Sequence, residues 1–143
     1  MSTPAQAGEE IGWRGYALPG LAARVGFGPA SLIIGVVWAS WHLAIFFTPA
    51  SDTFGPSFPL YLRQVTALSA TMAWLHWRTG GSLLPVMLFH AAVNNTKDIV
   101  PSALAGATNS FSMQGSLAAC LAVALLWLGA AWCLAKMWTA RRA

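Results

Sequence analysis

Charged side chains are scarce in this sequence. Asp, Glu, Lys and Arg make up 8% of the 143 residues and hydrophobic residues make up 57%, whereas soluble domains are roughly a quarter charged. This scarcity excludes an ordinary soluble domain and indicates a membrane protein. A spanning helix needs about 20 mostly apolar residues. The longest stretches without a charged side chain are residues 25–51, 64–77, 79–96 and 99–135, and the first and last are long enough to cross a membrane alone.

Cysteines and acidic side chains are also few. Cys120 and Cys133 are the only cysteines, and their separation places them on different faces of one helix, which argues against a disulfide or a cysteine metal pair. The net charge of +4 would suggest a nucleic-acid partner in a soluble protein. In a membrane protein, basic residues gather at the cytoplasmic ends of helices. We therefore expect membrane lipid and no nucleic acid as a partner, in the cell (inner) membrane, with the tail that carries Lys136 in the cytoplasm.

The fold class that follows is all-α, a polytopic membrane helix bundle in a single domain over residues 1–143, with residues 1–8 as a flexible N-terminus. A first helix begins near Pro4 and is expected to end at Pro19-Gly20, before a short amphipathic connector at residues 21–27. About four spanning or partly spanning helices follow, separated by polar loops at residues 48–59 and 97–112. We expect these helices at residues 29–47, 58–77, 83–95 and 113–137.

Two adjacent carboxylates stand out near the N-terminus. Glu10 and Arg14 are four residues apart and can form an ion pair on one face of the first helix. Glu9 lies about 100° round that helix and lacks this partner, so Glu9 is the better candidate for a general base. The alternative is that both glutamates belong to a solvated helix terminus, where the helix dipole favours negative charge.

Three histidines lie in the apolar helices. His42 has aromatic neighbours and could act chemically or simply be a packed histidine. His90 and Asn94 are four residues apart and share one helix face, so they could act at one site or hold two membrane helices together. His76 stands beside Trp77 and Arg78, and we expect it at the membrane interface.

A carboxylate, two histidines and an amide on three separate helices suit water-mediated acyl chemistry. One group takes a proton from water, another orients the water, and donors stabilise the oxyanion. A zinc centre is a weaker alternative, since the sequence has no HExxH helix. If a divalent metal such as zinc is present, Glu9, His42 and His90 would be its ligands.

Three ordered motifs resemble the CPBP family of intramembrane proteases, which includes type 2 CAAX prenyl endopeptidases and bacteriocin-processing, Abi-type or immunity proteins. The motifs are Glu9-Glu10-x-x-x-Arg14, Trp38-x-x-x-His42 and His90-x-x-x-Asn94, and Gly15-Tyr16-x-Leu18-Pro19 also looks like part of the first. The resemblance implies an endopeptidase in which Glu9 activates water with help from His42. It implies that His90 and Asn94 stabilise the oxyanion and that Glu10, Arg14 and Trp38 support the site. Its substrate would be a membrane-associated peptide or protein, prenylated or not.

This chain departs from the family pattern in two ways. Trp38 stands where the family more often has Phe. The family usually has several membrane helices before the glutamate pair, and none precedes it here. We therefore expect a truncated or inactive member, or part of an assembly such as a homo-oligomer. The glutamate mechanism needs no metal, although family members are often labelled metalloproteases.

The rival function is a non-catalytic immunity or partner-binding membrane protein that keeps the motif residues as structural contacts. A proton or ion pathway is a poorer third reading, because the two central uncharged stretches offer no ionisable groups beyond the histidines.

Overall fold

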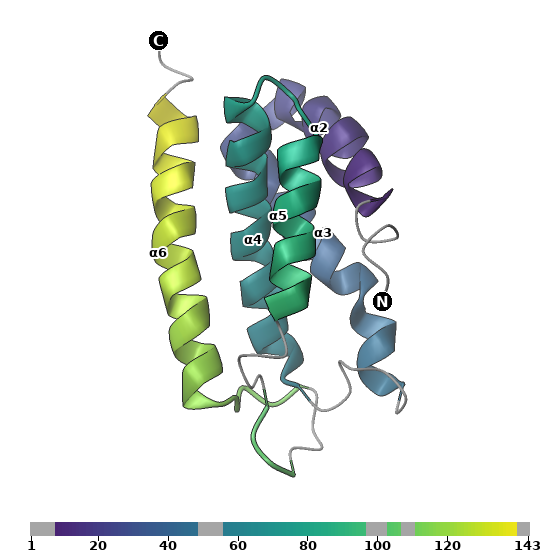
Figure 1. The fold of residues 1–143 in the computed structure, drawn as a ribbon, viewed down its shortest axis with the longest axis vertical. Coiled ribbons are helices and arrows are strands. Elements are labelled where there is room, and N and C mark those ends of the chain that lie inside the picture. Colours follow the sequence, from purple (N-terminus) through teal and green to yellow (C-terminus); the bar gives the residue numbers. More distant parts are fainter. Residues whose placement is uncertain (1–7, 49–55, 97–102, 107–110, 140–143) are drawn as a thin grey trace.

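The computed structural model of the chain describes residues 8–48, 56–96, 103–106 and 111–139. Within these ranges every regular element is a helix, which confirms the all-α class (Figure 1). The α-helix α4 is central and contacts α3, α5 and α6, while α2 packs on α3. The predicted helix start near Pro4 and the flexible residues 1–8 lie almost wholly outside the described residues. The elements in order are η1 (Ile11–Ala17), α2 (Leu18–Val25), α3 (Phe27–Trp41), η2 (Leu43–Phe47), α4 (Phe58–Arg78), α5 (Leu84–Thr96) and α6 (Leu117–Thr139).

The first helix does not end at Pro19-Gly20, so the predicted break and the separate connector at residues 21–27 are wrong. The π-helix η1 continues directly into α2, and the Leu18 N–H bonds the Trp13 carbonyl five residues back. Pro19 then stands in the first turn of α2, where a missing N–H costs little. The chain turns only at Gly26, whose φ of 83° is in the range that glycine adopts most easily.

Helices α3 and α4 form the closest helix pair. Gly35 removes a side chain at their contact, because a Cβ there would lie 2.7 Å from the Thr66 Cα. The Ser69 hydroxyl donates to the Ser31 carbonyl across the same interface at 2.8 Å. Small residues and such hydrogen bonds let helices approach closely where no water is available.

The helix predicted for residues 29–47 is interrupted at His42. The α-helical part ends at Trp41, and the tighter 3₁₀-helix η2 follows. The His42 backbone N–H bonds the carbonyls of Ala39 and Ser40, while the Trp38 carbonyl accepts from the His42 ring instead. The ring therefore takes the place of the backbone donor that would have continued the α-helix.

The later helices follow the prediction closely. Helix α4 matches its predicted range to within one residue, with Ser57 as its N-cap. Helix α5 begins one residue late, and α6 begins four residues late because the Ser116 hydroxyl accepts from the Ala119 N–H as a cap. The described residues of both predicted loops are not helical except for Phe58 and Pro59, which form the first turn of α4. Cys120 is exposed and Cys133 buried, as expected for different faces.

Among the described residues, two helical segments are long and apolar enough to cross a membrane, Phe27–Phe47 and Leu117–Trp138. Helix α4 has 21 residues, which at 1.5 Å each also approaches the thickness of a bilayer core. Its buried face carries Thr66, Ser69 and His76, which lower its apolar content. Two of the four predicted spans thus meet the criteria of length and composition.

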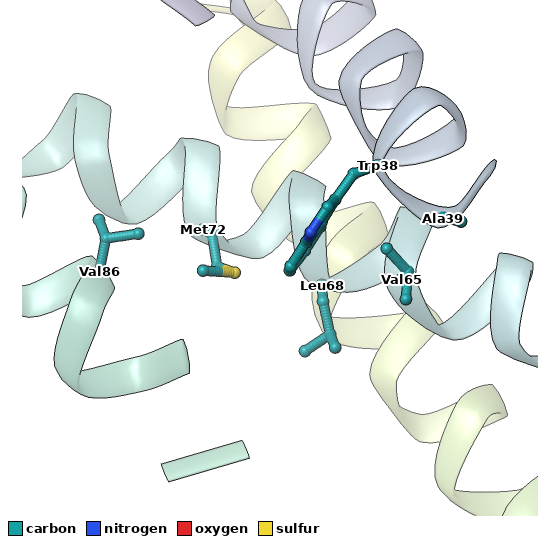
Figure 2. Close-up of a cluster of buried hydrophobic side chains, with 6 residues drawn as sticks. All are labelled: Trp38, Ala39, Val65, Leu68, Met72 and Val86. Atoms are coloured by element: carbon teal, nitrogen blue, oxygen red, sulfur yellow. The ribbon is translucent and has the colours of Figure 1, made fainter. Parts of the chain in front are cut away.

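A cluster of buried side chains joins α3, α4 and α5. Trp38 of α3 lies against Val65, Leu68 and Met72 of α4, and Val86 supplies the contact from α5 (Figure 2). Trp38 is only 4% exposed and Met72 only 1%. This apolar cluster fixes the position of the indole ring, whose other contacts are polar.

The α3–α4 contact predicts the effect of a single methyl group. Gly35→Ala should destabilise the fold by about 1–3 kcal/mol, because the methyl group meets backbone atoms of α4 that cannot move aside. Unfolding in detergent, followed by circular dichroism, measures the change. Gly129→Ala is the matched control, since a Cβ there meets nothing within 4 Å, and it should leave stability unchanged or raise it by up to about 1 kcal/mol. Equal stability of the two variants would contradict this packing.

Candidate active site

The carboxylate of Glu10 is buried between two partners. Its Oε1 accepts from Arg14 Nη1 at 3.0 Å and from His90 Nδ1 at 2.8 Å. Glu10 is 0%, Arg14 1% and His90 6% exposed. A buried carboxylate is stable only when it is paired and hydrogen-bonded. The ion pair predicted from the spacing of Glu10 and Arg14 is therefore present, and the bond from His90 joins the first helix to α5.

Glu9 faces a different partner. Its Oε2 accepts from the indole Nε1–H of Trp38 at 3.0 Å, and the residue is half-buried. Glu9 therefore lacks the ion pair that holds Glu10, as the helical geometry predicts. The motif spacing does not predict the indole hydrogen bond, although Trp38 has a donor N–H that a phenylalanine at this position would lack.

The ring of Trp38 lies at the centre of the predicted residues. The Arg14 guanidinium carbon is 4.5 Å from the ring centroid, within the range of a cation–π contact. The His90 ring is 5.1 Å away and the His42 ring 6.2 Å away, both in edge-on arrangements. The three motifs that are far apart in the sequence therefore meet around one indole.

The hydrogen bond of His42 determines which of its nitrogens is free. His42 Nδ1 lies 3.0 Å from the Trp38 carbonyl oxygen. A carbonyl can only accept, so the proton must be on Nδ1. In a neutral imidazole, Nε2 then carries a lone pair and can accept a proton from water. His42 is half-buried, and its neighbour Trp41 is 61% exposed.

His90 has a similar bond to a partner of different charge. Its Nδ1 must carry a proton and donate to the Glu10 carboxylate, because a carboxylate oxygen can only accept. Asn94 follows one turn later on the same face of α5 and is half-buried, so its amide can reach the same space.

His76 belongs to this neighbourhood and is buried within the bundle, and its place at the membrane interface stays a prediction. The residue is 5% exposed, and the charges that act on it are those of Arg14 and Glu10. Its signal in the sequence is the spacing Ser69, Met72, His76, which places all three on one buried face of α4. Within the described residues, Glu10 Oε2, Arg14 Nη2 and His76 Nδ1 are buried without a hydrogen-bond partner.

The arrangement does not fit the metal centre considered for Glu9, His42 and His90. In the described part of the chain, no three His, Cys, Asp or Glu side chains are grouped so that they could hold a metal ion. Each of the three residues is instead bound to a different partner: Trp38 Nε1, the Trp38 carbonyl and Glu10. The label of metalloprotease therefore has no support here, and we derive no step through a metal.

Aromatic rings continue from His42 toward the N-terminal end of α4. The contacts run from His42 to Tyr61 at 6.0 Å, then to Phe46 at 4.9 Å, and then to Phe58 at 5.3 Å. On the other side, the His42 ring lies 4.8 Å from Trp41. The surroundings of His42 are therefore mainly apolar and aromatic.

Comparison with known proteins gives two matches. The family model described as "Type II CAAX prenyl endopeptidase Rce1-like" matches residues 2–96, a range that includes every residue of the candidate site and ends with α5. CAAX prenyl protease 2 of Methanococcus maripaludis is 26% identical over 98 residues. The aligned part is 64% of this chain and 36% of that relative, so the chain spans little more than a third of its length. No solved structure matches the chain.

The buried ion pair predicts an asymmetry between single and double variants. Arg14→Met should lower the free energy of unfolding by about 3–5 kcal/mol, because it leaves the Glu10 carboxylate without its guanidinium partner. Adding Glu10→Gln should recover part of this loss, since it removes the uncompensated charge. Chemical unfolding in detergent measures both. Arg24→Met, at an exposed arginine, is the control and should stay near wild type. An equal loss in Arg14→Met and Arg24→Met would contradict the buried pair.

Proposed function

The chain belongs to the Rce1-like family of type II CAAX prenyl endopeptidases, and from this premise we propose that it is an intramembrane endopeptidase acting on a membrane-associated peptide or protein. The observation that carries the proposal is the position of Glu9. It is half-buried, held by a neutral N–H of Trp38 and separate from the buried pair of Glu10 and Arg14. A carboxylate held in this way is oriented but not neutralised, as a general base requires.

In the proposed reaction, water attacks the carbonyl carbon of the scissile peptide bond. Glu9 takes the proton from that water, and the free Nε2 of His42 accepts its second hydrogen bond. The carbon becomes tetrahedral and its oxygen becomes negative. Glu9 then returns the proton to the leaving nitrogen as the C–N bond breaks, giving a carboxylic acid and an amine. No covalent intermediate with the protein is needed.

His90 and Asn94 are the proposed donors to the oxyanion. This role requires a proton on both ring nitrogens of His90. Nδ1–H donates to Glu10 and Nε2–H donates to the substrate oxygen, with the Asn94 amide as a second donor. Donors that are fixed before the reaction stabilise the developing charge most effectively. Glu10 and Arg14 hold His90 in place, which explains why they are more deeply buried than Glu9, His42 and Asn94.

The proposed substrate is presented from the membrane, and a prenylated peptide is one member of this class. The relative from Methanococcus maripaludis is named CAAX prenyl protease 2. The aromatic surroundings of His42 offer apolar surface to a lipidated or unlipidated substrate alike, so the lipid requirement is a matter for experiment.

We also propose that this protein lies in the cell membrane with its C-terminus in the cytoplasm. The start of α3 lies beside the end of α6, because a Cβ on Gly28 would be 2.9 Å from the Trp138 ring. Trp77, at the end of α4, belongs to the same apolar cluster as Met137 of α6 and Val25 of α2. Arg24, Arg78 and Lys136 therefore share one end of the bundle, which the positive-inside rule assigns to the cytoplasm.

The rival function is a partner-binding protein in which the same residues only hold the helices together. The burial of Glu10, Arg14 and His90 suits that role. Glu9, His42 and Asn94 are only half-buried, and this distinguishes the two functions. An enzyme needs these side chains to be accessible to water and substrate, whereas a purely structural role does not.

Removal of the base should abolish cleavage. Glu9→Gln, Glu9→Ala and His42→Ala are each expected to lose the cleavage of a quenched peptide panel, prenylated and not, by at least about 100-fold, because water is no longer activated. The protein is purified in detergent, and circular dichroism shows whether the helices are intact. Asn95→Ala is the control, because Asn95 is exposed beside Asn94. Full cleavage activity of Glu9→Gln would contradict the proposed mechanism.

Asn94 separates the enzyme from its rival. We expect Asn94→Ala to reduce kcat by about 10- to 1000-fold while the unfolding temperature stays within a few degrees of wild type. The rival function predicts the reverse, a loss of stability and no cleavage of any substrate by wild type.

Addition of a chelator should leave the wild-type cleavage rate unchanged. A loss of activity that zinc restores would show that a metal takes part.

A further inference from the structure

We propose that Trp38 is a positioning residue that orients the general base through its indole N–H. The inference rests on the proposed function and adds a specific role for a residue that the family resemblance gives only a supporting place. The contact that carries it is the 3.0 Å hydrogen bond from Trp38 Nε1 to Glu9 Oε2. The indole nitrogen can only donate, so the direction of this bond is certain.

The bond selects one rotamer of the Glu9 side chain. A glutamate has several rotatable bonds and would sample many positions at a half-buried site. With Oε2 held by the indole, Oε1 remains for water, and the position of Oε1 is fixed by the plane of the carboxylate. An oriented base gains much of its advantage from such a fixed geometry.

The indole can serve as a fixed point because its other face is packed. Trp38 is 4% exposed and lies against Val65, Leu68 and Met72 (Figure 2). The Arg14 guanidinium, 4.5 Å from the ring centroid, adds a cation–π contact on a ring that is already enclosed. Movement of the indole would require the core between α3 and α4 to open.

The chemistry of the donor matters as well as its position. Arg14 gives its ion pair to Glu10, and Glu9 receives a neutral donor instead. A guanidinium partner would add a countercharge and a stronger, charge-assisted hydrogen bond. The neutral indole N–H orients the Glu9 carboxylate without a countercharge.

The same residue also acts on His42 through its backbone. The Trp38 carbonyl accepts from His42 Nδ1 at 3.0 Å and so leaves Nε2 free. A change of the Trp38 side chain keeps that carbonyl. Trp38→Phe therefore removes the bond to Glu9 and retains both an aromatic ring in the core and the acceptor for His42.

The first arm of the test is kinetic. Trp38→Phe should lower kcat by about 10-fold or more and leave KM within about twofold, because the base is misaligned and the substrate surface is unchanged. Trp74→Phe is the matched control: the Trp74 indole N–H is buried without a partner in the described residues, so the same atoms are lost without loss of a hydrogen bond. Trp74→Phe should keep the wild-type kcat and KM. Equal kcat values for wild type and Trp38→Phe would overturn the proposal.

The second arm does not depend on catalysis. In protein that carries isotope-labelled tryptophan, in lipid nanodiscs, the indole N–H resonance absent from Trp38→Phe belongs to Trp38. It should move in Glu9→Ala, which removes the acceptor, while the resonances of the other tryptophans keep their positions and report an intact fold. A Trp38 resonance that stays in place in Glu9→Ala would show that the bond is absent and would overturn the proposal. If wild type cleaves no peptide, the proposed function fails, and movement of this resonance still supports the positioning contact.

Discussion

The burial of the Glu10 carboxylate is the interaction on which the rest of the site depends. A carboxylate at 0% exposure in an apolar bundle is stable only with partners close by. Arg14 supplies one from the same helix and His90 supplies the other from α5. The requirement to pair this charge therefore fixes the first helix against α5 and gives His90 its orientation. Glu9, the next residue along the chain, is placed at the edge of the same cluster without sharing its ion pair.

Trp38 connects the charged cluster to the apolar core and so fixes the relative positions of the site residues. One face of the indole belongs to the apolar core between α3 and α4, and its polar edge meets Glu9. The two histidines then differ in the partner of Nδ1, a carbonyl for His42 and a carboxylate for His90. The proposed mechanism uses this difference, with His42 Nε2 as an acceptor for water and His90 as a donor to the oxyanion.

The sequence predicts much of this arrangement, and the failures have physical causes. Helical spacing alone gives the ion pair of Glu10 and Arg14 and the separate position of Glu9. The convergence of three motifs on one indole could not be derived from spacing, because it depends on tertiary packing. Pro19 misled the prediction, since a proline that breaks most helices is tolerated in the first turn of α2 after a π-helix. The burial of His76 on the inner face of α4 likewise depends on tertiary packing, which its sequence neighbours Trp77 and Arg78 do not reveal.

The central claim is that Glu9 activates water for hydrolysis, and water enriched in heavy oxygen tests it most directly. The purified protein is incubated with a cleavable membrane peptide in this water, and the released fragment is weighed by mass spectrometry. The account predicts one heavy oxygen in the new carboxyl group with wild type and no fragment with Glu9→Gln. A labelled fragment formed equally fast by Glu9→Gln would contradict the account.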